Sequence, residues 1–237
     1  MWNKEIIRRE RMNKSKVLEF FDADKLIKAP VHLIGCGAIG SHVGEALSKM
    51  GVTNIHLYDF DVVEAKNVTN QNFNSEDIGK PKIDVLARKM QANNPDIKIT
   101  YHPEGIQPPY RISEGYVFLM VDNIDLRRAI VEANRFNPNI LSWCDFRMRL
   151  TDAQYYFADA KRPDQVTNLL GSMNFSHEEA KEATPASACG VELSVIYTVQ
   201  NIVSWGICNF VRFLIGQEPK TLIFTNMDLC AIDVWPE

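Results

Sequence analysis

The residues that could do chemistry begin with a glycine-rich turn. Gly35, Gly37 and Gly40 form a G-x-G-x-x-G pattern, which follows the apolar run 31–34 and opens a stretch of helical character. In that context the glycines permit a tight turn, and the helix N-terminus offers N–H groups to a phosphate. Asp59 stands at the end of the next predicted strand, where a carboxylate can accept hydrogen bonds from ribose hydroxyls. These features alone suit NAD as well as ATP.

A second group of polar residues favours ATP over NAD as the expected ligand. After Asp59 come a further acid, an Asn/Gln loop, a lysine and a strand-end Asp-Asn pair, supplied by Asp61, Asn67, Gln71, Lys82, Asp122 and Asn123. The carboxyl edge of an open α/β sheet is where its ligands bind. A dehydrogenase needs no such set, whereas nucleotidyl transfer does. Lys82 can hold phosphate oxygens, and Asp122 can hold Mg²⁺ as pyrophosphate leaves.

The elements that must position these residues alternate along the chain. Apolar runs predict strands at 31–34, 54–59, 97–101, 117–121 and 140–144, and helical periodicity falls between them at 41–50, 81–93 and 125–136. This alternation predicts a doubly wound, Rossmann-like α/β fold with a mostly parallel sheet. A C-terminal helix over 190–215 and strands over 221–225 and 230–234 complete it.

The domain organisation is predicted to be simple. Residues 1–29 are charged and helical in character, and residues 30–237 form a single nucleotide-binding domain, a size that can bury one core. Within that domain, residues 160–188 are polar and contain two prolines. We predict a mobile crossover loop there, and loops of that length are usually functional or disordered.

Composition excludes several classes of protein. The 237 residues carry 26 Lys and Arg against 30 Asp and Glu, a formal charge of −4, which argues against a nucleic-acid-binding protein. The five cysteines are scattered and form no C-x-x-C pair, so we expect no structural zinc, no disulfide framework and a reducing, cytoplasmic compartment. The N-terminus has no apolar signal core.

One apolar stretch raises the question of a membrane. Residues 193–211 carry no formal charge. Gln200, Asn201 and Asn209 interrupt the stretch, so we predict a helix buried in the core or in a subunit interface, and no membrane association.

Taken together, the motifs resemble a known family. The glycine loop, the D-x-D-x-V-x-x-x-N-x-x-x-Q block that starts at Asp59, the lysine-proline turn of residues 79–82 and the Asp122-Asn123 turn resemble the ubiquitin-activating enzyme superfamily in its bacterial ThiF/MoeB/HesA form. The resemblance runs from residue 5 to residue 219. It implies an adenylyltransferase that uses ATP and Mg²⁺ to activate the C-terminal carboxylate of a small ubiquitin-like carrier protein or of a peptide, usually as a homodimer.

The resemblance also implies roles for individual residues. The three glycines would cradle the nucleotide and Asp59 would bind the ribose. Asn67 and Lys82 would contact phosphates, and Asp122 would position Mg²⁺. Nucleotide binding extends to the motif residues Asp61, Gln71 and Asn123.

Two residues outside these motifs enter by position. Arg11 stands where the family has an arginine that reaches the ATP of the partner subunit; Arg8 and Arg9 are nearby alternatives, and a solvated helix charge is the other interpretation. Cys189 lies between the predicted loop and the apolar helix, in a region where several relatives use a cysteine to take the activated carboxylate. The other interpretation of Cys189 is a small buried residue at a helix start. Cys36, inside the glycine loop, and Cys208, in the apolar helix, are interpreted as packing residues.

One departure from the family pattern leaves a second function open. Asn70 stands where the family has an arginine that stabilises phosphate charge, and a neutral amide cannot supply that charge. Either Lys66 or Lys80 replaces it, or the chain is a catalytically degenerate nucleotide-binding scaffold or heterodimer subunit. A third reading, an NAD(P)-dependent oxidoreductase, uses only the glycine loop and Asp59.

Overall fold

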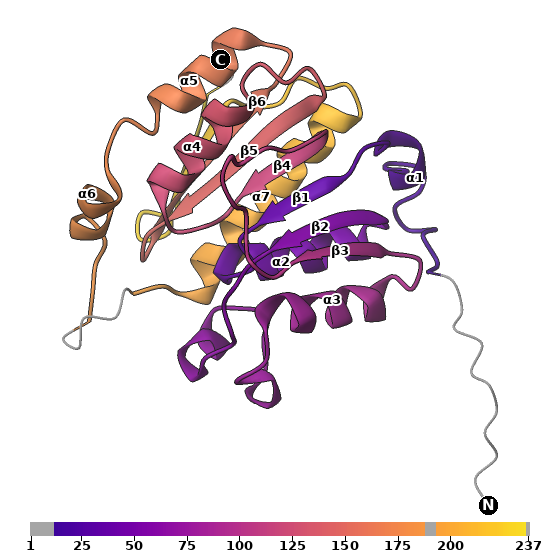
Figure 1. The fold of residues 1–237 in the computed structure, drawn as a ribbon, viewed down its shortest axis with the longest axis horizontal. Coiled ribbons are helices and arrows are strands. Elements are labelled where there is room, and N and C mark those ends of the chain that lie inside the picture. Colours follow the sequence, from indigo (N-terminus) through magenta and orange to yellow (C-terminus); the bar gives the residue numbers. More distant parts are fainter. Residues whose placement is uncertain (1–11, 188–192, 236–237) are drawn as a thin grey trace, which may run out of the picture.

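The sheet of this protein has eight strands in the order β3-β2-β1-β4-β5-β6-β7-β8. A computed structural model describes residues 12–187 and 193–235 (Figure 1). The first five strands in this order are parallel, and β6, β7 and β8 are antiparallel. The strands are β1 Val31–Ile34, β2 Asn54–Tyr58, β3 Lys98–His102, β4 Gly115–Leu119, β5 Ile140–Met148, β6 Asp152–Asp159, β7 Leu222–Asn226 and β8 Ala231–Trp235.

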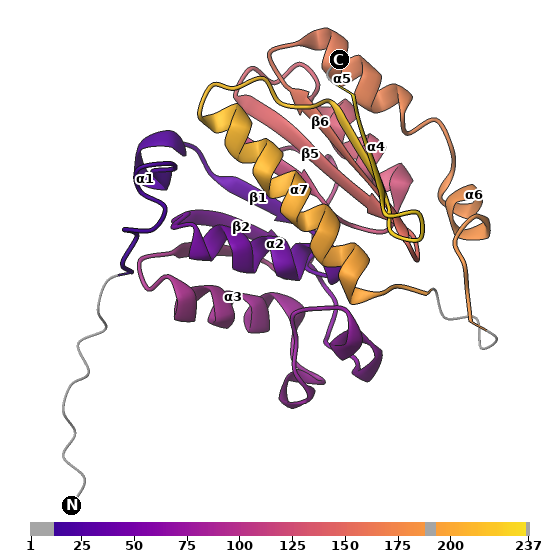
Figure 2. The same cartoon turned by 180° about the vertical axis from the view of Figure 1, so that it is seen from behind.

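Helices lie on both faces of the sheet, as in a doubly wound fold. The α-helices are α1 Ala23–Leu26, α2 Ala38–Lys49, α3 Lys82–Asn93, α4 Ile124–Asn134, α5 Pro163–Gly171, α6 His177–Glu182 and α7 Ile196–Leu214, and two 3₁₀ turns are η1 Ala65–Thr69 and η2 Ser75–Asp77. Helices α2, α3 and α7 share one face, and α4 and α5 lie on the other (Figures 1 and 2). The predicted fold class is therefore confirmed, as is each predicted strand to within a few residues.

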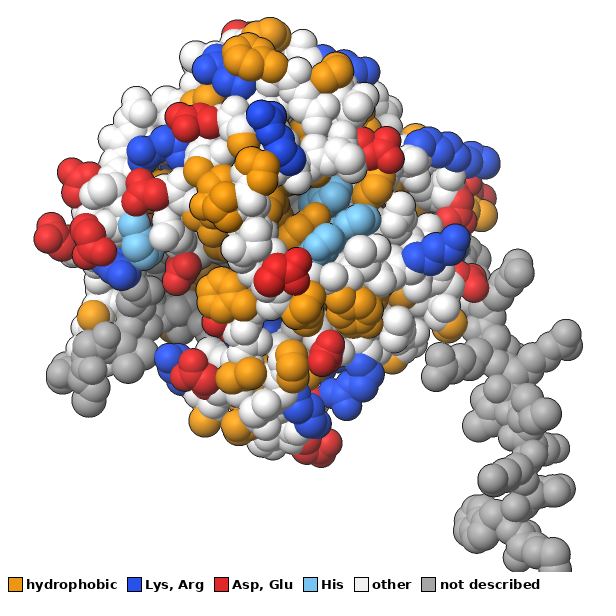
Figure 3. Space-filling model, viewed as in Figure 1, with side chains coloured by type: hydrophobic (Ala, Val, Ile, Leu, Met, Phe, Trp, Pro, Cys, Tyr) orange, Lys and Arg blue, Asp and Glu red, His pale blue; other side chains and the backbone are white. Residues whose placement is uncertain are grey.

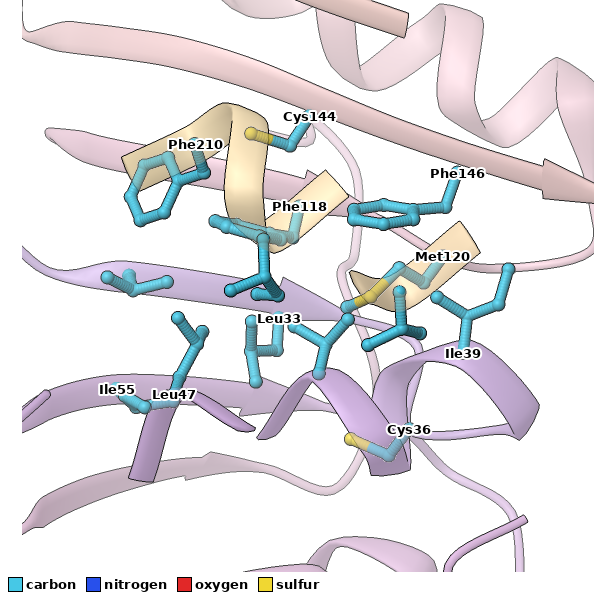
Figure 4. Close-up of a cluster of buried hydrophobic side chains, with 14 of the residues drawn as sticks. Leu33, Cys36, Ile39, Leu47, Ile55, Phe118, Met120, Cys144, Phe146 and Phe210 are labelled. Carbon is cyan, nitrogen blue, oxygen red and sulfur yellow. The ribbon is translucent and has the colours of Figure 1, made fainter. Parts of the chain in front are cut away.

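The main core lies between the sheet and the helices α2, α3 and α7. Leu33, Ile55 and Phe118 come from three neighbouring strands, and Leu47 from α2 and Phe210 from α7 meet them (Figure 4). All are essentially inaccessible to solvent. Strands buried on both faces are mostly apolar: β4 carries no polar residue except the Tyr116 hydroxyl, and the fully buried β1 carries one polar side chain, His32.

Gly206 permits close packing of α7 on the sheet. A Cβ atom there would lie 2.2 Å from Cε1 of Phe146 and 2.9 Å from Cδ2 of Tyr155, both buried. We expect Gly206→Ala to lower the free energy of unfolding by about 1–3 kcal/mol, because overpacking outweighs the better helix propensity. Gly171→Ala at the end of α5 is the matched control, since a Cβ there meets nothing within 4 Å. Urea unfolding measures both, and equal stabilities would contradict the packing argument.

The segment 160–188 differs from the predicted loop. It contains α5 and α6, and their ends explain why. Pro163 occupies the first turn of α5, and Ser176 and Glu179 form a reciprocal capping box at α6. The prediction of one long loop is therefore wrong for these two stretches.

At the chain ends, agreement is partial. The N-terminal segment predicted as helical holds one short described helix, α1, preceded by turns; residues 1–11 lie outside the described part. The predicted C-terminal helix is present as α7. No described helix is long and apolar enough to cross a membrane.

The β1–β3 part of the sheet leaves a polar, histidine-rich face on the side of α4. His32, His56 and His102 lie on three adjacent strands, and Tyr58 lies among them. Histidine side chains reach the surface there between hydrophobic neighbours (Figure 3). His32 is buried, and its ring nitrogens lie 2.9 Å from the Tyr58 hydroxyl and 2.9 Å from the carbonyl of Glu114.

This arrangement makes stability depend on pH. Burial, together with the neighbouring His56, lowers the pKa of His32 to about 4, and the pKa values of His56 and His102 are also lowered. The unfolded chain therefore binds more protons than the folded chain below pH 6.5, and stability falls as the pH drops from there toward 4. The titration of His32 alone would lower the free energy of unfolding by about 2 kcal/mol at pH 5 relative to pH 7.

Urea unfolding at pH 7 and pH 5 measures this loss. His32→Gln should abolish most of the difference between the two pH values, whereas His177→Gln, whose imidazole lies in α6 outside the cluster, should leave it unchanged. A difference that persists in His32→Gln would contradict the assignment.

Candidate functional site

The glycine loop joins β1 to α2 and lies against the end of β4. Gly35 has a φ of +97°, and a Cβ on it would lie 2.8 Å from the backbone of Met120 and Val121. A Cβ on Gly40 would meet the Gly35 carbonyl oxygen at 1.9 Å. Around Gly37, which begins α2, a Cβ would meet nothing within 4 Å of the described atoms. The loop thus packs tightly on the protein side and is open at the helix N-terminus, where an anion binds best.

Asp59 is tied to this loop by its carboxylate. Oδ2 accepts a hydrogen bond from the Cys36 N–H at 2.6 Å, and Oδ1 accepts one from the Asp61 N–H at 2.8 Å. Burial raises the pKa of the Asp59 carboxyl, while the two amides and the charge of Lys82 oppose that rise. Each oxygen retains a lone pair, so the carboxylate can still accept bonds from hydroxyl groups.

Lys82 reaches the same place from the first turn of α3. Its Nζ lies 2.8 Å from Oδ2 of Asp61, and the side chain is only 8% exposed, whereas that of Asp61 is 52% exposed. A nearly buried ammonium paired with an accessible carboxylate can exchange that partner for a phosphate with little rearrangement. Asp59 and Asp61, which follow β2, are therefore brought together with Lys82, which lies 21 residues beyond Asp61 in the sequence.

The polar loop after β2 lies beside α2. Asn67 is buried in η1, and its Oδ1 accepts a hydrogen bond from the Glu64 N–H at 2.8 Å. Next to it, Oε1 of Gln71 is buried without a hydrogen-bond partner among the described residues. A buried unpaired oxygen costs free energy unless a water or ligand donates to it. Oε1 of Gln71 can therefore accept a hydrogen bond from a bound ligand.

Asn70 is turned toward the other side of this loop. Its Nδ2 donates a hydrogen bond to Oγ of Ser194 at 2.7 Å, which links the loop to the segment that leads into α7. The two lysines that could replace the family arginine pair with acids: Lys66 with Glu64 at 3.0 Å and Lys80 with Asp77 at 3.8 Å. Both lysine side chains are about half exposed or more.

Asp122 and Asn123 form the turn between β4 and α4. Asp122 is exposed, and Oδ1 of Asn123 accepts a hydrogen bond from the Leu126 N–H at 3.0 Å as the N-cap of α4. Because Gly35 packs against Val121, this turn adjoins the glycine loop. The two turns flank the place where the strand order reverses between β1 and β4, which is the usual ligand site of such sheets.

Two predicted residues cannot be placed. Arg11 and Cys189 lie outside the described residues. Of the cysteines predicted to pack, Cys36 is buried, and burial raises the pKa of its thiol well above the usual range. Cys208 is exposed on α7, so it does not pack in the core of the chain.

Sequence reasoning missed a buried charged network at the same edge. Arg127 of α4 and Arg147 of β5 both contact the carboxylate of Asp145, which is fully buried. The signal was present, since Asp145 lies in a largely apolar strand, between Cys144 and Phe146, and buried carboxylates require partners. Arg147 lies two residues away on the same strand, but Arg127 comes from another element, α4, and no local pattern pairs it with Asp145.

The residue predicted to position a metal is Asp122. No group of three or more His, Cys, Asp or Glu able to hold a metal occurs among residues 12–187 and 193–235. Mg²⁺ is commonly held by one or two carboxylates together with substrate phosphates, and Asp122 offers such a carboxylate. A cavity of about 240 Å³ between α5 and β6–β8 holds none of the predicted residues.

Comparison with known sequences agrees with these motifs. The ThiF family pattern matches residues 11–141, more than half of the chain, and covers the glycine loop through the Asp122 turn. Ubiquitin-like modifier-activating enzyme 5 of Drosophila virilis is 29% identical over 150 residues, which cover 56% of this chain and 36% of the relative. The same enzyme of Drosophila pseudoobscura pseudoobscura is 30% identical over 116 residues, which cover 49% of this chain and 25% of the relative. The chain thus spans about a third or less of their length.

Solved structures agree on the fold. MccB of E. coli, solved with MccA-N7isoASN, superposes with a TM-score of 0.71 at 19% identity, over 90% of this chain and 65% of that one. MccB solved with ATP gives 0.67 at 21%, over 90% and 64%. PaaA gives 0.68 at 14%, over 99% and 77%. With the family pattern matched across its motifs and the fold shared, this chain belongs to the ThiF family.

Proposed function

We propose that this protein is an ATP-dependent adenylyltransferase that activates a carboxylate at the C-terminus of a small ubiquitin-like protein or a peptide. The observation that carries the proposal is the meeting of Asp59, Asp61 and Lys82 beside an open helix N-terminus. Relatives are named as activating enzymes of a ubiquitin-like modifier, and MccB is solved with ATP and with MccA, which supports both substrate classes.

In the proposed reaction, a carboxylate oxygen of the substrate attacks the α-phosphorus of ATP. A bond forms between that oxygen and phosphorus, the bond from phosphorus to the bridging oxygen breaks, and pyrophosphate leaves with the electron pair. The N–H groups at Gly37 hold phosphate oxygens, the Asp59 carboxylate holds ribose hydroxyls, and the polar loop supplies Asn67 and Gln71. Such a site acts by positioning and electrostatics.

Lys82 and Asp122 would stabilise the charge that develops. Lys82 would leave Asp61 for the phosphates, and Asp61 would remain close enough to keep the ammonium oriented. Asp122 would hold Mg²⁺, which neutralises phosphate charge when bound. Asn123 would act through the backbone, since its side chain caps α4.

Exchange of labelled pyrophosphate into ATP tests the proposal. We expect exchange in the presence of ubiquitin-fold carriers that end in glycine, or of short peptides with a free C-terminal carboxylate. The same substrates with an amidated C-terminus are the matched control, and they should support none. Exchange with neither form of any substrate would contradict the adenylyltransferase.

Asn70 favours a second candidate, a nucleotide-binding scaffold without turnover. The side chain bonds Ser194, and the neighbouring lysines are paired. Asn70→Arg separates the candidates in the same exchange assay. If the native chain is an active enzyme, the exchange rate of Asn70→Arg should differ from wild type by less than about threefold, because other residues already stabilise the phosphate charge. If the native chain is a scaffold, its exchange rate should rise by about 100-fold or more from an inactive baseline, the size expected for one restored charge-stabilising contact.

We also propose that the chain works as a homodimer. The exposed face of α7 bears Tyr197, Trp205 and Cys208 without a charged residue before Arg212, which is unusual for a helix surrounded by water. In such a dimer, Arg11 could reach the ATP of the partner subunit and Cys189 could receive the activated carboxylate. Light scattering tests the assembly, and a monomer at assay concentration would remove Arg11 from the partner's site.

A further inference from the structure

Three charged side chains are buried together where β4 and β5 end. The Asp145 carboxylate is fully buried, and the side chains of Arg127 and Arg147 are 7% and 13% exposed. Oδ1 of Asp145 pairs with Nη1 of Arg127, and Oδ2 accepts from Nε of Arg147 at 2.7 Å. Buried ion pairs contribute little net stability compared with apolar packing, because desolvation offsets their attraction. Because stability alone does not account for these ion pairs, we assign them a role in fixing the positions of the groups that they contact.

Arg127 holds the backbone that leads into the Asp122 turn. Its Nε donates to the Val121 carbonyl at 2.7 Å, and its Nη2 contacts the same oxygen. Nη1 donates to the Phe146 carbonyl at 2.5 Å. The Val121 carbonyl belongs to the peptide that enters Asp122, and Asn123 fixes the other side of the turn as a helix cap. The guanidinium thus fixes the position of the Asp122 backbone, from which the carboxylate extends.

Arg147 holds a different segment from the same carboxylate. It donates to the Ser172 carbonyl at 2.8 Å and to the Ser172 hydroxyl at 2.9 Å, at the end of α5. Its guanidinium also lies over the ring of Tyr156, 4.4 Å from the centroid. Arg128 fixes the next residues through the carbonyls of Met173 and Phe175. Residues 172–175, within segment 160–188, are therefore anchored to β5 and α4.

We infer that Arg127 and Arg147 are positioning residues that act through the shared carboxylate of Asp145, linking the place of Asp122 to the place of segment 172–175. The inference rests on the proposed function in taking Asp122 as a residue of the nucleotide site. One carboxylate cannot follow two guanidinium groups that move apart. A shift of segment 172–175, for example when a carboxylate substrate binds, would therefore displace Asp145, and with it Arg127 and the Val121 carbonyl.

Hydrogen exchange of the whole chain tests the linkage without any nucleotide. In Arg147→Lys, which keeps the charge but loses the planar fork, amide exchange should rise several-fold in 172–175 and also in 121–124, which Arg147 does not contact. Arg135→Lys, an exposed arginine at the end of α4 that lies over Phe136, is the matched control and should alter neither segment. A rise confined to 172–175 would overturn the linkage.

Calorimetry with Mg·ATP tests the positioning of Asp122. Arg127→Lys should raise the Kd for Mg·ATP about tenfold, and in the exchange assay it should raise KM more than it lowers kcat. An unchanged Kd in a folded variant would overturn the inference. Should Arg127→Lys fail to fold, Arg147→Lys still decides the linkage. Wild-type protein that binds no Mg·ATP, but shows the linked exchange, would instead contradict the proposed function and leave the linkage supported.

Discussion

Replacing Lys82 by alanine is expected to lower kcat/KM for ATP–pyrophosphate exchange by about 100-fold or more, the usual cost of one lost charge-stabilising donor. Lys82 is nearly buried and meets Asp61 at 2.8 Å, so its ammonium is held where phosphate oxygens would lie. No other described lysine is paired with Asp61. The assay uses whichever carboxylate substrate supports exchange by the wild-type chain.

Lys80→Ala is the matched control for that prediction. Lys80 lies two residues away, its side chain is 49% exposed, and its pairing with Asp77 is long at 3.8 Å. Exposed pairs of this kind contribute little, so exchange should stay within about twofold of wild type. Thermal unfolding checks that both variants are folded. A folded Lys82→Ala chain with the wild-type rate would remove Lys82 from the site.

Asp122→Asn is expected to give the second large effect. The substitution keeps the size of the side chain and removes the carboxylate charge that we assign to Mg²⁺, so exchange at a fixed Mg²⁺ concentration should fall by about 100-fold. Raising the Mg²⁺ concentration should restore part of the loss, because one of the charged ligands is missing while the phosphates remain. The measurement is the exchange rate as a function of Mg²⁺ concentration.

Glu132→Gln controls for simple loss of negative charge, since Glu132 lies on α4, the helix that follows the Asp122 turn. Glu132 is exposed on α4, away from its N-terminus. Its removal should leave both the rate and the Mg²⁺ dependence unchanged. If Asp122→Asn and Glu132→Gln have the same Mg²⁺ profile, Asp122 does not position the metal.

Much of the fold could be predicted because local sequence dictates it. Strand β4 is a continuous apolar run and β1 is apolar apart from His32, and burial on both faces favours such runs. The glycine loop is a local feature too, since Gly35 has a positive φ and a Cβ on Gly40 would strike the Gly35 carbonyl. These elements alone fix the topology around the site, and so the residues at the strand ends could be brought together from the sequence.

What escaped prediction depends on distant partners or on weak local signals. Helices α5 and α6 are short, and the proline in the first turn of α5 and the capping box of α6 outweigh a polar composition that is typical of loops. Residues 152–159 were not assigned to any element, because β6 takes its place through antiparallel pairing with β5 and β7. The bond from Asn70 to Ser194 joins residues far apart in the chain. No periodicity reveals such a contact.

The central claim is that this edge of the sheet binds ATP, and calorimetric titration tests it most directly. The chain is titrated with Mg·ATP and, in parallel, with NAD⁺, neither of which requires the identity of the carboxylate substrate. The account predicts micromolar binding of Mg·ATP that is weakened in Lys82→Ala, and no response to NAD⁺. Binding of NAD⁺ without binding of Mg·ATP would contradict it, and would leave Gly35, Gly37, Gly40 and Asp59 as an oxidoreductase's dinucleotide site.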